Sequence, residues 1–211
     1  MPVVIHGGGT IEGIAVGGLP DAIVDADMLA SNAVTTAKIA NSAVTAAKST
    51  GLGISEVDQW RVHTDFAGWV SAAIVSSNWE RVDTAPAAGK IGTGMAESSG
   101  IFTFPSTGIW QVYSDWSFNT NDEVRYNGVN IYATTNNSSY SQVTANYGSS
   151  VHDASGLCYG HCHAMAIVDI TDVSNQKVAM YLNSEAGNNT TWIGNTAKSE
   201  NVTFFIRLAD T

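Results

Sequence analysis

The amino-acid sequence predicts an all-β fold, an antiparallel sandwich or barrel, preceded by an N-terminal segment of different composition. Three observations support this. From about residue 54, short runs alternate apolar and polar residues, as strands with one buried face do. Glycine, proline, asparagine and serine separate these runs, and such residues favour turns. All six tryptophans lie beyond residue 59, so an aromatic core is expected there.

The composition narrows the class of protein. Hydrophobic residues make up 44% of the 211 positions and charged residues 13%, which is the composition of a folded chain. Nine basic residues against nineteen acidic ones give a net charge of −10, which disfavours a surface for nucleic acid. No apolar run approaches the about 18–20 residues that span a bilayer, and the first residues do not resemble a secretory signal. We therefore expect no nucleic-acid partner, no membrane insertion and synthesis in a cytoplasm.

Residues 1–20 form a glycine-rich segment with short β-branched runs between the glycines. This pattern predicts short extended pieces and turns. Such pieces cannot bury a core of their own, so the segment is expected to be an N-terminal anchor.

Residues 21–53 contain a ten-residue repeat, in which Val24, Val34 and Val44 are equivalent. A period of ten fits neither the heptad nor the eleven-residue repeat of coiled coils. Each unit must bury its few apolar residues against copies of itself or against a partner. The alternative is a flexible linker, but a linker needs no valine at fixed intervals. Alanine favours helix and the Val-Thr pairs favour extended pieces, so the conformation stays open.

The apolar residues expected to dock the first 50 positions against a partner are Ile11, Ile14, Val16, Leu19, Val24, Leu29, Val34, Ile39 and Val44.

Residues 54–211 are expected to form one β-domain. The segment "FPSTG" at 104–108 predicts a tight corner, because Pro105 fixes φ and Gly108 tolerates a positive φ. Three runs with a period of two predict strands with one face in the core. The residues expected on these core faces are Trp110, Val112, Trp116, Phe118, Val178, Met180, Leu182, Val202, Phe204, Ile206 and Leu208.

The opposite faces of the same strands also carry large apolar side chains. The alternation turns Ile109, Tyr113, Tyr181 and Phe205 outward. Single exposed apolar residues are normal, and scattered surface aromatics are the alternative interpretation. Aromatics on the outer face of three strands favour a second buried surface, and hence an oligomer interface.

Three stretches of this domain resemble one family. The sequences "NWERVD" (78–83), "KIGTGM" (90–95) and "ESSGIFTFPSTGIWQV" (97–112) are similar to virion proteins of tailed phages common among viruses of marine bacteria. The resemblance covers roughly Ile54 to Asp210. It implies a C-terminal antiparallel jelly-roll sandwich of the C1q/TNF type that assembles as a homotrimer.

The same resemblance assigns individual strands. It implies that "FTFPSTGIWQVYSDWSF" is the middle hairpin of the fold, and that "KVAMYL" and "NVTFFIRL" are its penultimate and last core strands. The strands that carry Tyr113, Tyr181 and Phe205 would then supply the inner sheet around the threefold axis. Residues 136–163 match no motif of the family.

The N-terminal part carries a second similarity. Residues 9–48, which include "GGLPDAIVDADMLA" and "AVTTAKIA", resemble the stretches that head many phage fibre and head-fibre proteins. This implies an extended attachment segment with short repeats, which docks to another virion protein of the capsid or tail.

The cluster "CYGHCH" at 158–163 suggests zinc by composition. As a strand, however, it places Cys158 and Cys162 toward the core and His161 and His163 away from it, so the four cannot share one ion. The cysteines would be ~13 Å apart at about 3.3 Å per residue, too far for a disulfide, so buried free thiols are expected. The two histidines, joined by their copies near a threefold axis, are the one remaining metal hypothesis; no cofactor is expected.

These features predict a phage virion protein that forms a short trimeric fibre or a capsid decoration. Its knob would serve attachment to a host-surface glycan or stabilisation of the capsid. The candidate host contacts are Tyr140, Tyr147 and Tyr159, unless these merely pack a long loop. About 50 residues before the knob leave no long shaft, which favours a head fibre over a tail-fibre receptor-binding protein. No nucleophile elbow, P-loop or zincin spacing occurs, so no enzyme is expected, and a glycan-cleaving tip is the less favoured alternative.

Overall fold

The computed structural model describes residues 4–5, 11–12, 34–35, 38–40, 43–44, 53–67, 71–151, 155–185 and 189–211. The chain divides into two units, Met1–Thr50 and Gly51–Thr211.

In the first unit, β1 (Val4–Ile5) pairs antiparallel with β2 (Ile11–Glu12). Within the repeat, the backbone NH of Lys38 donates to the carbonyl of Thr35 at 2.9 Å, and that of Ala43 donates to Ala40 at 3.0 Å. Both are bonds between residues three apart, which close single tight turns.

The predicted docking residues can be followed only in part. Val34, Ile39 and Val44 are exposed, and Ile11 is described only as part of the backbone of β2. The remaining five lie outside the described residues: Ile14, Val16, Leu19, Val24 and Leu29.

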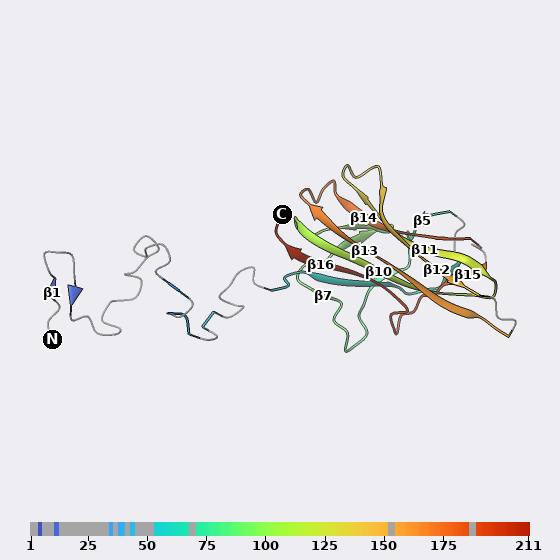
Figure 1. Ribbon diagram of the computed structural model, residues 1–211, viewed down its shortest axis with the longest axis horizontal. Helices are drawn as coiled ribbons and strands as arrows, with labels where there is room; N and C mark the ends of the chain where they lie inside the picture. The colour runs from blue at the N-terminus through green and yellow to red at the C-terminus, as the bar shows by residue number, and fades with distance from the viewer. Residues whose placement is uncertain are drawn as a thin grey trace. The chain divides into compact units, whose positions relative to one another are not determined.

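The second unit is a sandwich of two antiparallel sheets, as the sequence predicts (Figure 1). In its described part, the first sheet has eight strands: β3 (Val57–Val62), β4 (Phe66–Ala67), β6 (Trp79–Arg81), β7 (Lys90–Ile91), β10 (Gly108–Thr120), β13 (Cys158–Ile170), β15 (Thr190–Trp192) and β16 (Asn201–Ala209). The second has six: β5 (Ala73–Ile74), β8 (Ala96–Ser98), β9 (Ile101–Thr103), β11 (Val124–Thr134), β12 (Ser141–Ser150) and β14 (Lys177–Ser184).

The long strand β10 joins the parts of the eight-stranded sheet. It pairs with β13 along its length, and with β16 and β15; β3 pairs with β16 in turn. In the six-stranded sheet the order is β12-β11-β14-β9-β8. Strands that follow one another in the chain, such as β10 and β11 or β13 and β14, therefore lie in different sheets, which is typical of a jelly roll.

The predicted corner at 104–108 is present, with Gly108 at a φ of 144°. It does not close a hairpin, however, because β9 pairs with β8 and β14 whereas β10 belongs to the other sheet. The corner carries the chain from one sheet across to the other.

The core between the sheets is rich in aromatic rings. Trp116 packs edge-on against Trp79 at 5.6 Å and Trp192 at 6.2 Å between ring centroids. The core faces predicted for β10 and β14 are confirmed: Trp110, Val112, Trp116, Phe118, Val178, Met180 and Leu182 are all buried.

The face predicted for β16 is wrong. Phe205 is fully buried in the core, where its ring lies 4.9 Å from that of Phe102. Phe204, which the alternation places inside, is only half-buried, and Leu208 is exposed. The register fixes this, because Phe205 pairs with the buried Val112 on β10.

The sheet predicted for Tyr181 is also wrong. Tyr181 does lie on an outward face, half-buried. Its strand β14, however, pairs with β11 and β9 in the six-stranded sheet, whereas Tyr113 lies on β10 of the other sheet. Tyr113 and Tyr181 therefore lie on opposite sides of the sandwich and cannot share one face of a single chain.

Among the described residues, no helix is long and apolar enough to cross a membrane.

Candidate functional site

The outer face of the eight-stranded sheet is the first candidate surface. Its middle is built from two rows of side chains that the strand register aligns. Tyr113 on β10 pairs with Met165 on β13 and with Phe204 on β16, and Gln111 pairs with Ile167 and with Ile206. We call this the assembly face and define it by Ile109, Tyr113, Met165, Ile167, Phe204 and Ile206.

On β16 the assembly face is more apolar than the side that faces the core, and on β13 its two apolar side chains are larger than most of those on the core side. Met165 and Ile167 are 54% and 64% exposed. The buried side chains on the core side of β13 are small, except for Ile170 at its end: Cys162, Ala164 and Ala166. Large apolar residues outside and small ones inside are typical of a sheet that buries a second surface against a partner.

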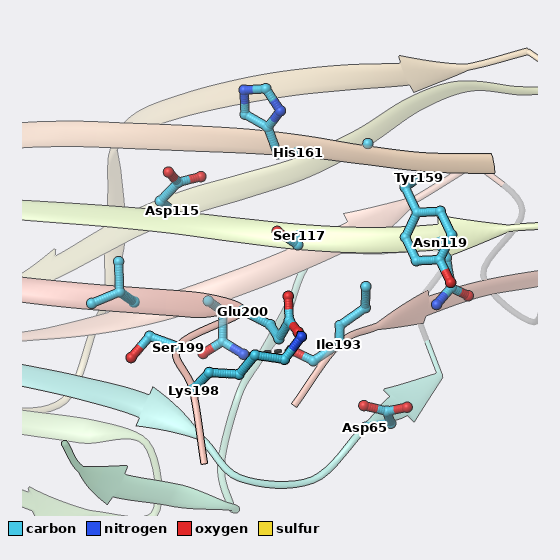
Figure 2. A pocket seen from close by; sticks show the side chains of 13 residues that line it. Asp65, Asp115, Ser117, Asn119, Tyr159, His161, Ile193, Lys198, Ser199 and Glu200 are labelled. Carbon is cyan, nitrogen blue, oxygen red and sulfur yellow. Dashed lines mark hydrogen bonds and ion pairs between the residues drawn. The ribbon is translucent and has the colours of Figure 1, made fainter. Parts of the chain in front are cut away.

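Next to the apolar rows, the same sheet face becomes polar and is hollowed. The hollow has a volume of about 860 Å³. Figure 2 shows Asp115, Ser117 and His161 on neighbouring strands, with Lys198, Ser199 and Glu200 in the loop that precedes β16. The register continues the rows, since His163 pairs with Asp115 and His161 with Ser117.

The three carboxylates that line this hollow have partners in the protein. Asp65 accepts a hydrogen bond from the backbone NH of Gly194 at 2.7 Å, and Asp115 accepts one from the Tyr113 hydroxyl at 3.1 Å. Glu200 pairs with Lys198, whose pKa this hydrogen bond raises. Burial, and then the charge of Asp115, raise the pKa of Tyr113.

The "CYGHCH" cluster lies on β13 with the alternation that the sequence predicts. Cys162 is buried and free, Cys158 is half-buried and free, and His161 and His163 are exposed on the opposite face. Burial, with a further contribution from Asp115, raises the pKa of the Cys162 thiol to about 12. In the described part of the chain, no three His, Cys, Asp or Glu side chains gather as a metal site would need.

The outer face of the six-stranded sheet is the second candidate surface. It carries four tyrosines, which we call the tyrosine face: Tyr126 and Tyr132 on β11, Tyr147 on β12 and Tyr181 on β14. Tyr132 stacks on Tyr181 at 4.1 Å, and Tyr126 meets Tyr147 edge-on at 5.8 Å between ring centroids. Burial, and then Tyr132, raise the pKa of Tyr181.

The three predicted host contacts do not all lie on one face, because Tyr159 belongs to the other sheet. Tyr147 is exposed on the tyrosine face, whereas Tyr159 is exposed on β13 of the other sheet. Tyr140 is half-buried just before β12, and its hydroxyl oxygen is buried with no hydrogen-bond partner among the described residues. The stretch 136–159 is not one long loop, because β12 occupies ten residues of it.

Sequence reasoning missed Tyr126, Tyr132 and Asn183 as surface residues of this face. A signal for Tyr132 existed in the alternation of β11, where the buried Val129 and Ile131 place it on the other side. Asn183 follows Tyr181 by two residues and so shares its face.

No protein-family model matches this chain, and no curated protein matches it. Solved structures do match. Eiger TNF from S. frugiperda aligns with a TM-score of 0.54 and 12% identity, over 75% of this chain and 94% of that chain. Murine APRIL at pH 8.0 aligns with a TM-score of 0.50 and 14% identity, over 72% of this chain and 98% of that chain. The fold is therefore a TNF-like antiparallel jelly roll, and at these identities the likeness concerns the fold alone.

Proposed function

We propose that this chain is a phage virion structural protein that forms short homotrimeric projections, as a head fibre or capsid decoration. The observation that carries the proposal is the assembly face. It is an apolar sheet surface on the outside of a TNF-like jelly roll, in a chain whose segments 90–95 and 97–112 resemble trimeric phage knob proteins.

Closed symmetry accounts for the use of this face. Copies of a chain can each pack one surface against a different surface of the next copy. Such copies form a closed ring when the rotation from copy to copy returns to the first one. A trimer would bury Met165 and Ile167, which are mostly exposed in the single chain, and would leave the tyrosine face on the other side of each sandwich free.

The first unit supplies the attachment. Val34 and Val44 are exposed at a spacing of ten residues, and Ile39 is exposed between them. Exposed apolar residues at a regular spacing suit a segment that is buried only against another virion protein. We expect docking to the capsid or tail through residues 1–50, and the mature protein therefore resides in the virion.

The displayed knob then serves host-surface attachment or capsid stabilisation without catalysis. Three equal copies raise the avidity of weak binding to a repeating glycan. A tail-fibre receptor-binding protein is the second candidate, since it would use the same trimer and the same display. A glycan-cleaving tip is the less favoured alternative: it would need two carboxylates about 5–10 Å apart in a cleft, and Asp65, Asp115 and Glu200 around the polar hollow are the carboxylates it could use.

Cryo-electron microscopy of the phage particle whose genome encodes this chain tests the proposal. Trimeric density of this fold on the capsid is the expected result. Density only at the tail would assign the tail-fibre role instead. A particle without this chain, or a chain present as isolated monomers, would overturn the proposal.

A further inference from the structure

We propose that the tyrosine face binds a neutral sugar ring in a hollow lined by Tyr126, Tyr147 and Asn183. This deepens the proposed function and rests on it in one respect: the knob must be displayed on the particle for the site to meet a glycan. The site itself is argued from the single chain.

The strand register places the residues around the hollow next to one another. Gly128 on β11 pairs directly with Tyr147 on β12 and with Asn183 on β14. Tyr126 lies two residues before Gly128, and its ring is almost perpendicular to that of Tyr147, at 85°. The hollow measures about 420 Å³ and is lined by Tyr126, Tyr147 and Asn183, a size within the range of about 300–1,000 Å³ for small-molecule sites.

The space that a side chain at position 128 would occupy is filled by Asn183 and Tyr147. A Cβ atom there would stand 2.4 Å from the Asn183 amide oxygen and 2.7 Å from the Tyr147 ring. Both groups therefore approach the backbone of β11 more closely than any other residue at position 128 would allow.

The buried side-chain amide of Asn130 holds the side-chain amide of Asn183 in place. Asn130 is 1% exposed, and its Nδ2 donates to the Asn183 Oδ1 at 2.9 Å and to the backbone carbonyl of Tyr181 at 3.2 Å. Since the oxygen of Asn183 is engaged, its Nδ2 group is the part of the amide left to donate to a ligand. The donor is thus held in place before any ligand binds, which lowers the entropy lost on binding.

The chemistry of these side chains selects the ligand class. None of the three lining residues carries a charge, so neither an anion nor a cation is favoured. A pyranose has an apolar C–H face that matches a tyrosine ring, and hydroxyls that match an amide donor and phenol hydroxyls. Tyrosine combines such apolar contact with a polar group at little entropic cost. One shallow site of this kind would bind weakly, and three copies would bind a repeating polysaccharide far more strongly.

The test uses the full-length ¹⁵N-labelled chain, titrated separately with the methyl glycosides of glucose, galactose and mannose and with N-acetylglucosamine. We expect at least one of these sugars to shift the NMR signals of the Gly128 backbone amide and the Asn183 side-chain amide. No shift with any of the four, or shifts confined to the other sheet, would overturn the site.

Two variants examine the groups separately. Tyr147→Val removes one ring and keeps a good strand former, and it should weaken binding at least tenfold. Asn183→Asp keeps an oxygen for Asn130 but removes the donor, and it should weaken binding several-fold. The control is Val143→Ala, which lies on the same strand and is exposed to a similar degree, 48% against 55% for Tyr147; its affinity should be unchanged.

The possible results distinguish a failure of the sugar site from a failure of the proposed virion role. Unchanged affinity in both Tyr147→Val and Asn183→Asp would overturn the site even if the wild-type chain binds sugar. If sugars bind here but the chain is absent from the particle, the virion role fails and the site stands. If the chain decorates the particle but binds none of the four sugars, the site fails and the virion role stands.

Discussion

At the scale of single residues, Asn201 and Thr203 explain the orientation of β16. The Thr203 hydroxyl lies 2.8 Å from that of Ser114, which also accepts a hydrogen bond from the Trp116 indole at 2.7 Å. The Asn201 Oδ1 accepts a hydrogen bond from the backbone NH of Val62 at 2.8 Å. These buried polar groups are all paired, so their burial costs little. The strand can therefore turn its less apolar side inward and leave Val202, Phe204 and Ile206 on the outside.

The neighbouring residues Phe204 and Phe205 give a sharp test of this orientation. Phe205→Ala removes a fully buried ring and should lower the free energy of unfolding by about 3–5 kcal/mol. Phe204→Ala, the matched control, removes a half-buried ring on the assembly face and should lower the stability of the single chain much less. Denaturant unfolding of both variants at a concentration where the chain is monomeric measures this, and equal losses would contradict the assignment.

A second prediction concerns the two thiols. Burial raises the pKa of Cys162 to about 12 from 9.0, so its thiol stays neutral and unreactive at pH 8. Iodoacetamide should modify the half-buried Cys158 first and reach Cys162 only after denaturation, which peptide mass spectrometry can measure. Because the neutral thiol is favoured in the folded state, its contribution to stability is complete below pH 9 and decreases as the pH rises from 9 toward 12. Rapid native labelling of Cys162 would show that β13 is not packed as described.

At the scale of elements, the two-residue turn between β8 and β9 illustrates how local geometry fixes a strand pair. Ser98 pairs with Ile101, and the two residues between them, Ser99 and Gly100, have φ angles of 53° and 81°. Two positive φ angles define a type I′ turn, whose twist matches that of the strands. The backbone NH of Gly100 also donates to the Glu97 carboxylate at 2.6 Å.

The geometry of this turn predicts different effects on stability for two neighbouring substitutions. A Cβ at Gly100 would lie 2.1 Å from the carbonyl oxygen of Val75, so Gly100→Ala should destabilise the fold by more than the about 1–3 kcal/mol of a strained φ alone. Ser99→Gly relieves a positive φ and should leave stability unchanged or slightly higher. Thermal unfolding of the two variants compares them, and a neutral Gly100→Ala would refute the turn geometry.

The sequence predicts the buried faces of some strands in this chain and not of others. Alternation identified the core faces of β10, β13 and β14, because in each strand one side is clearly more suited to burial. It failed in β16, where both sides carry a phenylalanine and the deciding contacts are the hydrogen bonds of Asn201 and Thr203. It also could not assign Tyr181 to a sheet, because alternation states which residues share a face but not which strands pair. The hollow between Tyr126, Tyr147 and Asn183 was missed for the same reason, since it depends on three strands in register.

At the scale of the whole molecule, the two outer faces of the sandwich differ in chemistry. One carries the apolar assembly face and a polar hollow beside it, and the other carries tyrosines and amides. This difference supports a division of roles, in which one sheet joins copies and the other is displayed. Position 181 belongs to the displayed side, so a charge there should not affect assembly, contrary to the expectation from sequence.

A charge on the assembly face should prevent trimer formation, whereas a charge on the tyrosine face should not. Ile167→Asp places a charge on the part of the assembly face that β13 contributes, where a dry interface would leave it buried and unpaired. Because Ile167 is 64% exposed in the single chain, the variant should fold normally and yet be monomeric by light scattering. Tyr181→Asp, the matched control on the tyrosine face, should stay trimeric. A trimeric Ile167→Asp with a monomeric Tyr181→Asp would mean that the copies meet through the six-stranded sheet, and the roles of the two faces would then be exchanged.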